Sequence, residues 1–206
     1  MRRLMAALVL LGFAACADPD TGQLRKTTVP TYDTATGRLT QLTFDQNKNG
    51  VIDTWTDMDG AKPVRTRQDR DEDGRIDRWE YYDANAKLVK VGFSRRNDGK
   101  ADAWAYSGSD GKVDRVEISH TSDENAISRW EFYQGDVLER AEEDTNGDGR
   151  ADKWETYRDG VVLTAAFDED GDAKPDRRFT YDGATLVFIE SEPDAAGRFR
   201  RKMPAK

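Results

Sequence analysis

Residues 69–82 read Asp-Arg-Asp-Glu-Asp-Gly-Arg-Ile-Asp-Arg-Trp-Glu-Tyr-Tyr, an acidic loop that leads directly into an aromatic segment. The same combination recurs along the chain, marked by tryptophans at intervals of 24 to 26 residues. All five tryptophans belong to this series: Trp55, Trp79, Trp104, Trp130 and Trp154. A sixth copy around Arg178 keeps the pattern without the tryptophan, as terminal repeats often do. The spacing predicts a tandem array of about six units.

Each unit contains two short strand-forming segments around a turn. The first, such as Trp79–Tyr82, is rich in aromatic residues and reaches an Asp, Asn or Gly turn within about five residues, which leaves no room for a helix. A second apolar segment, such as Leu88–Phe93, completes a hairpin. We therefore expect an all-β fold: an elongated antiparallel meander of repeated β-hairpins with about a dozen strands, in which each hairpin contacts mainly its neighbours in sequence.

The alternation of side chains along a strand places Trp79 and Tyr81 on the same face. Repetition of the tryptophan in every unit then builds an aromatic ladder along that face. Such a ladder is either the packed core of the sheet or a stacking surface for a sugar or peptide. The sequence leaves both interpretations open.

The loop before Trp79 has the spacing of a calcium site. Its acids occupy loop positions 1, 3, 5, 9 and 12, glycine occupies position 6, and Arg75 stands at position 7. A second loop repeats this order. The two sets are Asp69, Asp71, Asp73, Gly74, Arg75, Asp77 and Glu80, and Asp144, Asn146, Asp148, Gly149, Arg150, Asp152 and Glu155. Both resemble the calcium loop of EF-hand proteins, in which position 7 supplies a backbone carbonyl and a glutamate at position 12 closes the ligand shell.

The other four loops match less well. One keeps Asp45, Asn47, Asn49, Gly50 and Asp53 but has Thr56 at position 12. Another keeps Asp168, Asp170, Asp172 and Asp176 but has Ala173 at position 6 and Phe179 at position 12. The loops that begin at Ser94 and His120 keep too few acids to be counted as sites.

The likeness to EF-hands covers the loops and not the fold, because strands are expected on both sides of each loop. Helix-free calcium-loop repeats, such as thrombospondin type 3, are the closer resemblance, and the cofactor they imply is Ca²⁺. We expect the tightest binding at the loops beginning with Asp69 and Asp144. In the competing interpretation, the Asp, Asn and Gly residues only shape tight turns, and nearby arginines offset the acidic charge.

The N-terminus predicts export. Arg2 and Arg3 precede an apolar run, Leu4–Ala15, that is too short to span a bilayer. Cys16 follows two alanines and resembles the lipidated cysteine of bacterial lipoproteins. That resemblance implies a signal peptide over residues 1–16, a membrane anchor through lipid on Cys16, and the outer membrane, because no aspartate directly follows the cysteine. A cleavage site at Ala15-Cys16-Ala17 would instead give a secreted or periplasmic protein. Residues 17–30 are expected to be a flexible tether and residues 31–206 the β-hairpin repeat domain.

The composition excludes two further classes. Without Arg2 and Arg3 the chain keeps 30 basic against 40 acidic residues, so it should not bind nucleic acid through phosphate neutralisation. One histidine, His120, and one cysteine cannot form a nucleophile–base pair or a zinc site, so we expect no enzyme. Two functions remain: a calcium-stabilised envelope lipoprotein that binds or adheres to a protein or glycan through its sheet, or a metal-free envelope scaffold that docks a protein partner.

Overall fold

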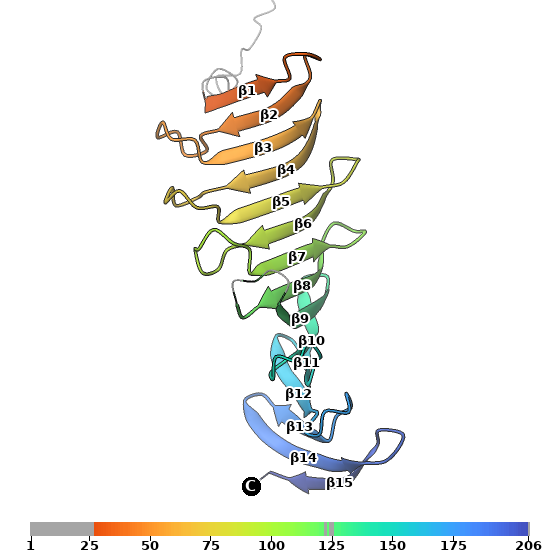
Figure 1. The fold of residues 1–206 in the computed structure, drawn as a ribbon. Helices are drawn as coiled ribbons and strands as arrows, with labels where there is room; N and C mark the ends of the chain where they lie inside the picture. The colour runs from red at the N-terminus through yellow and green to blue at the C-terminus, as the bar shows by residue number, and fades with distance from the viewer. Residues whose placement is uncertain (1–26, 122, 124–125, 206) are drawn as a thin grey trace, which may run out of the picture.

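The computed structural model describes residues 27–121, 123 and 126–205, which form one open antiparallel sheet of fifteen strands (Figure 1). The expected signal peptide and Cys16 lie outside the described residues. The strands are β1 (Thr28–Tyr32), β2 (Leu39–Phe44), β3 (Thr54–Asp59), β4 (Lys62–Gln68), β5 (Arg78–Tyr82), β6 (Leu88–Phe93), β7 (Ala103–Ser107), β8 (Val113–Ser119), β9 (Ile127–Gln134), β10 (Val137–Glu143), β11 (Lys153–Arg158), β12 (Val161–Phe167), β13 (Arg177–Asp182), β14 (Thr185–Pro193) and β15 (Phe199–Pro204).

The strand order confirms the predicted meander. The strands lie in the sheet in the same order as in the sequence, so each pairs only with the strands before and after it. There are fifteen strands rather than about a dozen, because β1 and β2 precede the first tryptophan unit and β15 follows the last unit. Thr28–Pro30, the end of the stretch expected to be a tether, forms the start of β1.

The two ends of each hairpin differ in kind. The short turns lie along one side of the sheet and the long acidic loops along the other (Figure 1). Close to the short turns the strand register shifts by one residue, for example at Asp57/Met58, Tyr81/Tyr82 and Thr156/Tyr157. A bulge of this kind increases the local twist of a strand pair. The bulge recurs in successive hairpins and therefore contributes to the twist of the sheet.

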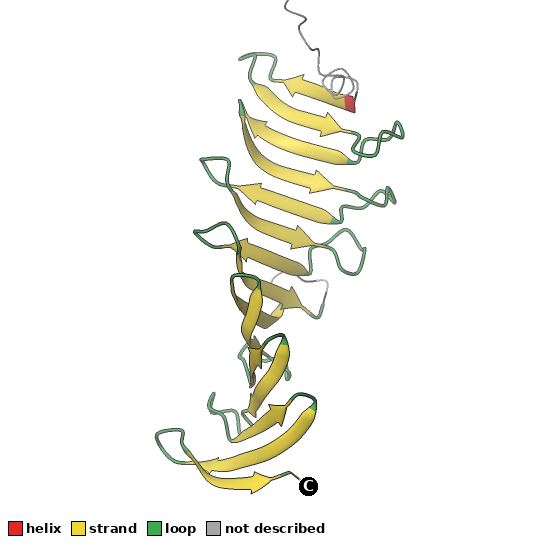
Figure 2. Ribbon diagram, turned by 180° about the vertical axis from the view of Figure 1, so that it is seen from behind, coloured by secondary structure: helices red, strands yellow, loops and turns green. Residues whose placement is uncertain are grey.

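The sheet is a single layer, and no second layer of the described chain covers either face (Figure 2). Packing therefore comes from side chains on neighbouring strands rather than from a closed interior. The buried apolar residues among those described are small, apart from Val91 and Trp104: Val91, Ala101, Ala103, Trp104, Ala141, Ala165 and Ala166. No helix in this part of the chain is long and apolar enough to cross a membrane.

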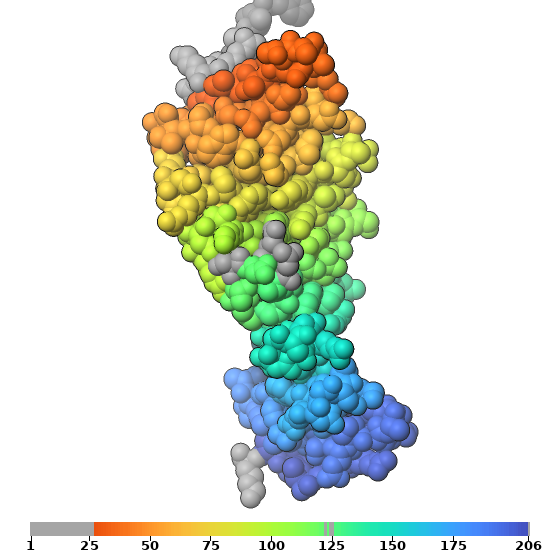
Figure 3. All heavy atoms as spheres, in the orientation of Figure 1, coloured from red at the N-terminus to blue at the C-terminus, as the bar shows by residue number. Residues whose placement is uncertain are grey.

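The sheet turns sharply at β9 to β12, where the ribbon is seen edge-on while β1 to β8 face the viewer (Figure 1), and the molecule is narrowest there (Figure 3). Polar contacts tie these strands together on the face opposite the tryptophans. Arg129 on β9 pairs with Glu143 on β10 at 3.2 Å and with Glu155 on β11 at 3.0 Å. Lys153 pairs with the same two carboxylates at 3.1 and 2.8 Å. This ion-pair network links three successive strands at the twist.

Candidate metal sites in the acidic loops

The acidic loops are fixed at both ends by backbone hydrogen bonds that continue the strand ladder. In the loop from Asp69, the Asp69 N–H donates to the carbonyl of Asp53 in the preceding loop at 2.9 Å. The Asp77 N–H donates to the carbonyl of Gln68 at 2.8 Å. The residues at loop positions 1 and 9 are thereby held side by side at the ends of β4 and β5, which brings their carboxylates together.

Some oxygens of these carboxylates shape the loop. Asp69 Oδ2 accepts from the Gly74 N–H at 2.9 Å, and Asp77 Oδ2 accepts from the Arg70 N–H at 2.6 Å. Asp73 Oδ1 accepts from the Arg75 N–H at 2.8 Å, which forms a local turn. These aspartates therefore do shape tight turns, as the competing interpretation predicts. The turns do not use every oxygen, so the same carboxylates remain available to a cation.

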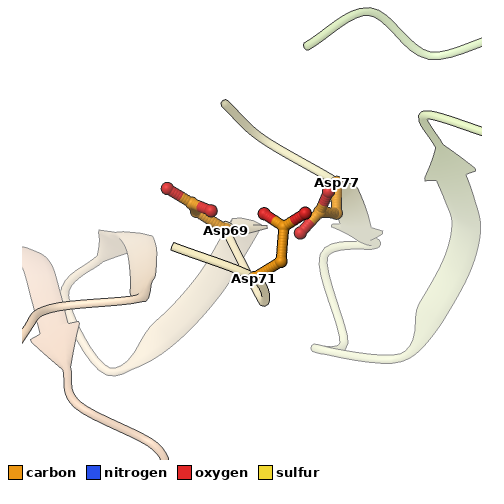
Figure 4. Close-up of side chains that lie close together, drawn as sticks. All are labelled: Asp69, Asp71 and Asp77. Carbon is orange, nitrogen blue, oxygen red and sulfur yellow. The ribbon is translucent and has the colours of Figure 1, made fainter. Parts of the chain in front are cut away.

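Three carboxylates of this loop form a cluster. Asp69, Asp71 and Asp77 each place an oxygen within 4.8 Å of the other two, with Asp71 between its neighbours (Figure 4). The same three loop positions form a second cluster: Asp168, Asp170 and Asp176. Carboxylate oxygens converging at this distance repel one another, and a hard divalent cation removes that repulsion.

Within the two clusters, Asp69 has a buried oxygen that no hydrogen bond satisfies. Only 6% of the residue is exposed, and its Oδ1 is buried without a hydrogen-bond partner. A buried anionic oxygen left unpaired is costly. Asp168, in the second cluster, differs because its two oxygens accept from the N–H groups of Gly171 at 2.7 Å and Ala173 at 2.8 Å. Desolvation opposes ionisation of Asp168, but these backbone donors outweigh it and lower the pKa of the carboxyl.

The glutamates at position 12 lie elsewhere. Glu80 belongs to neither cluster and accepts instead from Arg78 Nε at 2.8 Å and the Tyr82 hydroxyl at 2.6 Å. Glu155 likewise accepts from the Tyr157 hydroxyl at 2.7 Å, in addition to its bonds with the ion-pair network. Both glutamates lie within strands, and both have strand partners rather than loop partners. The structure does not bring them to the loops that they were expected to close.

The remaining candidate residues cap their own loops. In the loop from Asp144, the Asp144 oxygens accept from the N–H groups of Gly147 and Gly149, and Asp152 accepts from Thr145. Four further residues form local turns, in which a side-chain oxygen accepts from the backbone N–H two residues later: Asn146, Asp148, Asp170 and Asp172. Asp45 accepts from Lys48 and Gly50, and Asp53 accepts from Gln46. Asn47 and Asn49 form local turns and also donate to Glu72.

The loop from Ser94 places two arginines beside its buried aspartate. Asp102, at loop position 9, is 1% exposed, and its Oδ1 accepts from the Arg95 N–H at 2.9 Å. The guanidinium groups of Arg95 and Arg96 lie 3.6 and 4.0 Å from its carboxylate. Arg96 stands at position 3, where the Asp69 loop has Asp71. The positive charge beside Asp102 is thus supplied by side chains of the same loop.

Sequence reasoning missed the role of loop position 4. This residue has a positive φ in the loops that the structure describes there, for example Glu72 (60°), Asn97 (53°) and Gly147 (80°). Where it has a long enough side chain, it contacts the preceding loop, as Glu72 contacts Asn47. The available signal was the residue type, because Gly and Asn are the residues that adopt this backbone conformation most readily.

No protein-family model matches the chain, and no curated protein sequence matches it. Among solved structures, the chain is similar to one described as the crystal structure of accessory secretory protein 1, 2 and 3 in Streptococcus pneumoniae, with 15% sequence identity and a TM-score of 0.39. The similarity covers 52% of this chain and 19% of that chain.

Proposed function

We propose that this chain is a non-enzymatic cell-envelope protein whose β-repeat array is stabilised by calcium in its acidic loops and acts as a binding or adhesion surface. The observation that carries the calcium assignment is the cluster of Asp69, Asp71 and Asp77, together with the unpartnered buried oxygen of Asp69. A flexible shell made only of oxygens suits Ca²⁺ better than the smaller, strictly octahedral Mg²⁺. The expected dissociation constant is about 10⁻⁴ to 10⁻³ M, the range of extracellular calcium modules.

A calcium titration tests this proposal. Isothermal titration calorimetry of the purified protein should show two sites, one for each cluster. Asp69→Asn should remove one site and Asp168→Asn the other, because each change deletes a charged ligand without changing size. An absence of binding at millimolar calcium would leave the loops as turns.

The tryptophan face supports the role of a binding surface. One row of cross-strand neighbours across β4 to β10 alternates cations with aromatic rings: Arg65, Tyr81, Lys90, Tyr106, Arg115, Phe132 and Arg140. The Lys90 ammonium lies 3.9 Å from the Trp104 ring centre, and the Arg115 guanidinium lies 4.3 Å from that of Tyr106. Cations recur on every second strand, about 10 Å apart. This spacing is close to the length of a disaccharide in an extended chain.

An acidic envelope glycan therefore fits this face, because its carboxylates can pair with the row of cations. Binding of an anionic polysaccharide should exceed that of a neutral one of equal length and should weaken as salt is added. Arg115→Gln with Arg140→Gln should reduce the binding. Equal binding of charged and neutral polymers would argue against this partner.

A metal-free scaffold that docks a protein partner is the second candidate. The cation–aromatic row favours it as well, since these contacts require no metal. The two candidates differ in their calcium dependence. A scaffold should melt at the same temperature, and hold its partner equally well, with chelator or with calcium.

The envelope location rests on Cys16, which we propose carries a lipid anchor. Cys16→Ser should move the protein from the membrane fraction to the soluble fraction. A variant that remains in the membrane fraction would require another anchor.

A further inference from the structure

Asn97 in the loop from Ser94 reaches over the preceding loop. Its Nδ2 donates to Asp71 Oδ2 at 2.9 Å and to Asp73 Oδ2 at 3.1 Å. The Asn97 carbonyl accepts from Arg75 Nη1 at 3.0 Å, which fixes its backbone against the same loop. A polar group from the next repeat therefore faces two carboxylates of the candidate calcium loop.

The same contact occurs one repeat earlier with donor and acceptor exchanged. The Glu72 carboxylate accepts from Asn47 Nδ2 at 2.6 Å and from Asn49 Nδ2 at 2.7 Å. Glu72 and Asn97 both stand at loop position 4, and each faces positions 3 and 5 of the loop before it. The contact thus belongs to the repeat and not to one pair of side chains.

Three buried oxygens in these two loops have no hydrogen-bond partner: Asp69 Oδ1, Asn97 Oδ1 and Asp102 Oδ2. Asp102 Oδ2 has a cation nearby, because Arg96 Nε lies 4.0 Å away, so the other two are the candidates for a bound cation. Amide N and O have nearly the same shape, so a half-turn of the Asn97 amide exchanges them. After that turn, Oδ1 faces Asp71 and Asp73 in place of Nδ2. The Asn97 oxygen then faces Asp71, one of the three carboxylates of the cluster.

We propose that the calcium site of the Asp69 loop is completed by Asn97 of the next loop, whose amide turns to offer Oδ1 when the cation binds. This inference rests on the proposed calcium binding and adds a ligand from outside the loop. It also replaces Glu80, which is engaged by Arg78 and Tyr82, as the source of an additional ligand. The cation bound at the Asp69 loop then links two adjacent repeats.

The loop from Asp144 is followed by a loop that has no side chain at position 4, the position that Asn97 occupies in the loop from Ser94. The next loop has Gly171 at position 4, and a small pocket of about 80 Å³ lies between the two loops, lined by residues that include Asn146, Asp148, Asp152 and Gly171. A Cβ on Gly171 would meet nothing within 4 Å. Glycine therefore already occurs at position 4 of another loop with a positive φ. Asn97→Gly should keep the backbone conformation while it deletes the proposed ligand.

The test uses Asp168→Asn as the reference protein, so that only the Asp69 site remains, with calcium chloride as the titrant in calorimetry. Asn97→Gly should weaken binding about tenfold, the loss typical of one supporting group at a metal site. Asn97→Asp should bind at least as tightly as the reference, because it keeps an oxygen ligand and adds a negative charge, although it loses the N–H donor. Asn85→Gly, in an exposed turn at the opposite side of the sheet, is the matched control and should change nothing.

The two Asn97 variants separate a ligand from a structural donor. A purely structural Asn97 acts through its Nδ2, so Asn97→Asp would then weaken binding as much as Asn97→Gly does. That result, or unchanged affinity in Asn97→Gly while the reference binds calcium, would overturn this inference alone. An absence of calcium binding in both the reference and the unmodified protein would overturn the proposed function together with it.

Discussion

Trp104 on β7 shows how a single residue packs in a sheet that has no second layer. Its ring lies against Gly92 of the neighbouring strand, and the residue is 6% exposed. A Cβ on Gly92 would overlap three carbons of the ring. Glycine weakens a strand in general, but here its lack of a side chain makes room for an aromatic ring.

Gly92→Ala should therefore destabilise the protein by about 1–3 kcal/mol, because the buried Trp104 ring must leave its position. Denaturant unfolding followed by tryptophan fluorescence measures this loss. Gly183→Ala is a useful comparison, since a Cβ there meets nothing within 4 Å and any cost comes from its positive φ of 58°. Equal stability of Gly92→Ala and the unmodified protein would show that Trp104 is not held against β6.

Glu80 illustrates what could and could not be predicted from single residues. The acids at loop positions 1, 3 and 9 were identified from their spacing, and the structure brings Asp69, Asp71 and Asp77 together. The role of Glu80 as the closing ligand at position 12 was predicted from the resemblance to EF-hand loops. In EF-hands a helix follows the loop and directs that residue toward the cation. Here β5 begins at Arg78, so Glu80 instead projects perpendicular to the sheet, next to Thr66.

Glu80→Gln should therefore leave the calcium-induced rise in melting temperature unchanged. The substitution should still lower stability, since it removes the charge that accepts hydrogen bonds from Arg78 and Tyr82. Burial opposes ionisation of Glu80, but these two bonds outweigh it and lower its pKa. Loss of the calcium response in thermal unfolding of this variant would show that Glu80 does close the loop.

At the scale of elements, the hairpins were predictable and their irregularities were not. Aromatic alternation and Asp-Gly turns predict the strand pairs, because both signals are local. The bulges near the turns and the additional hairpin of β1 and β2 have no such signal, since residues such as Leu39–Phe44 lack the tryptophan. Contacts from loop position 4 depend on how loops stack, which a single repeat does not reveal.

The ion-pair network at β9 to β11 gives the stability of the protein a dependence on pH. Burial disfavours the charged form of Glu155, but hydrogen bonds from Lys153 and Tyr157 outweigh burial and hold its pKa below the ordinary value of 4.5. The pKa of Glu143 is lowered in the same way, with Lys153 as the main donor against burial. The folded state therefore binds protons less readily than the unfolded state at these two groups.

The protein should lose stability as the pH falls, because the unfolded state takes up protons at these two groups before the folded state does. This stabilisation is fully present above about pH 4.5 and is lost progressively as the pH falls through the lowered values. The melting temperature should thus fall as the pH is lowered from about 5 toward 3. Arg129→Met should lower stability at neutral pH by about 2 kcal/mol or more, and should reduce this acid dependence. A pH profile for Arg129→Met that parallels the unmodified protein would show that Arg129 contributes nothing to the acid dependence.

The whole molecule is built so that stability comes from contacts between neighbouring strands. All strand pairings join neighbours in sequence, so removal of one end leaves the pairings of the rest intact. A chain that ends at Phe167, without β13 to β15, should keep its strand signal in circular dichroism and melt somewhat lower. Complete loss of structure on this truncation would indicate long-range cooperation that the meander does not contain.

The most direct test of calcium stabilisation is thermal unfolding of the purified protein with chelator and with calcium well above its dissociation constant. Calcium at ten to one hundred times its dissociation constant should add about 1–3 kcal/mol per site. For a chain of this size that raises the melting temperature by about 2–4 °C per kcal/mol. Magnesium should raise it less, and Asp69→Asn should lose a large part of the rise. Identical curves with chelator and with calcium for the unmodified protein would contradict the account.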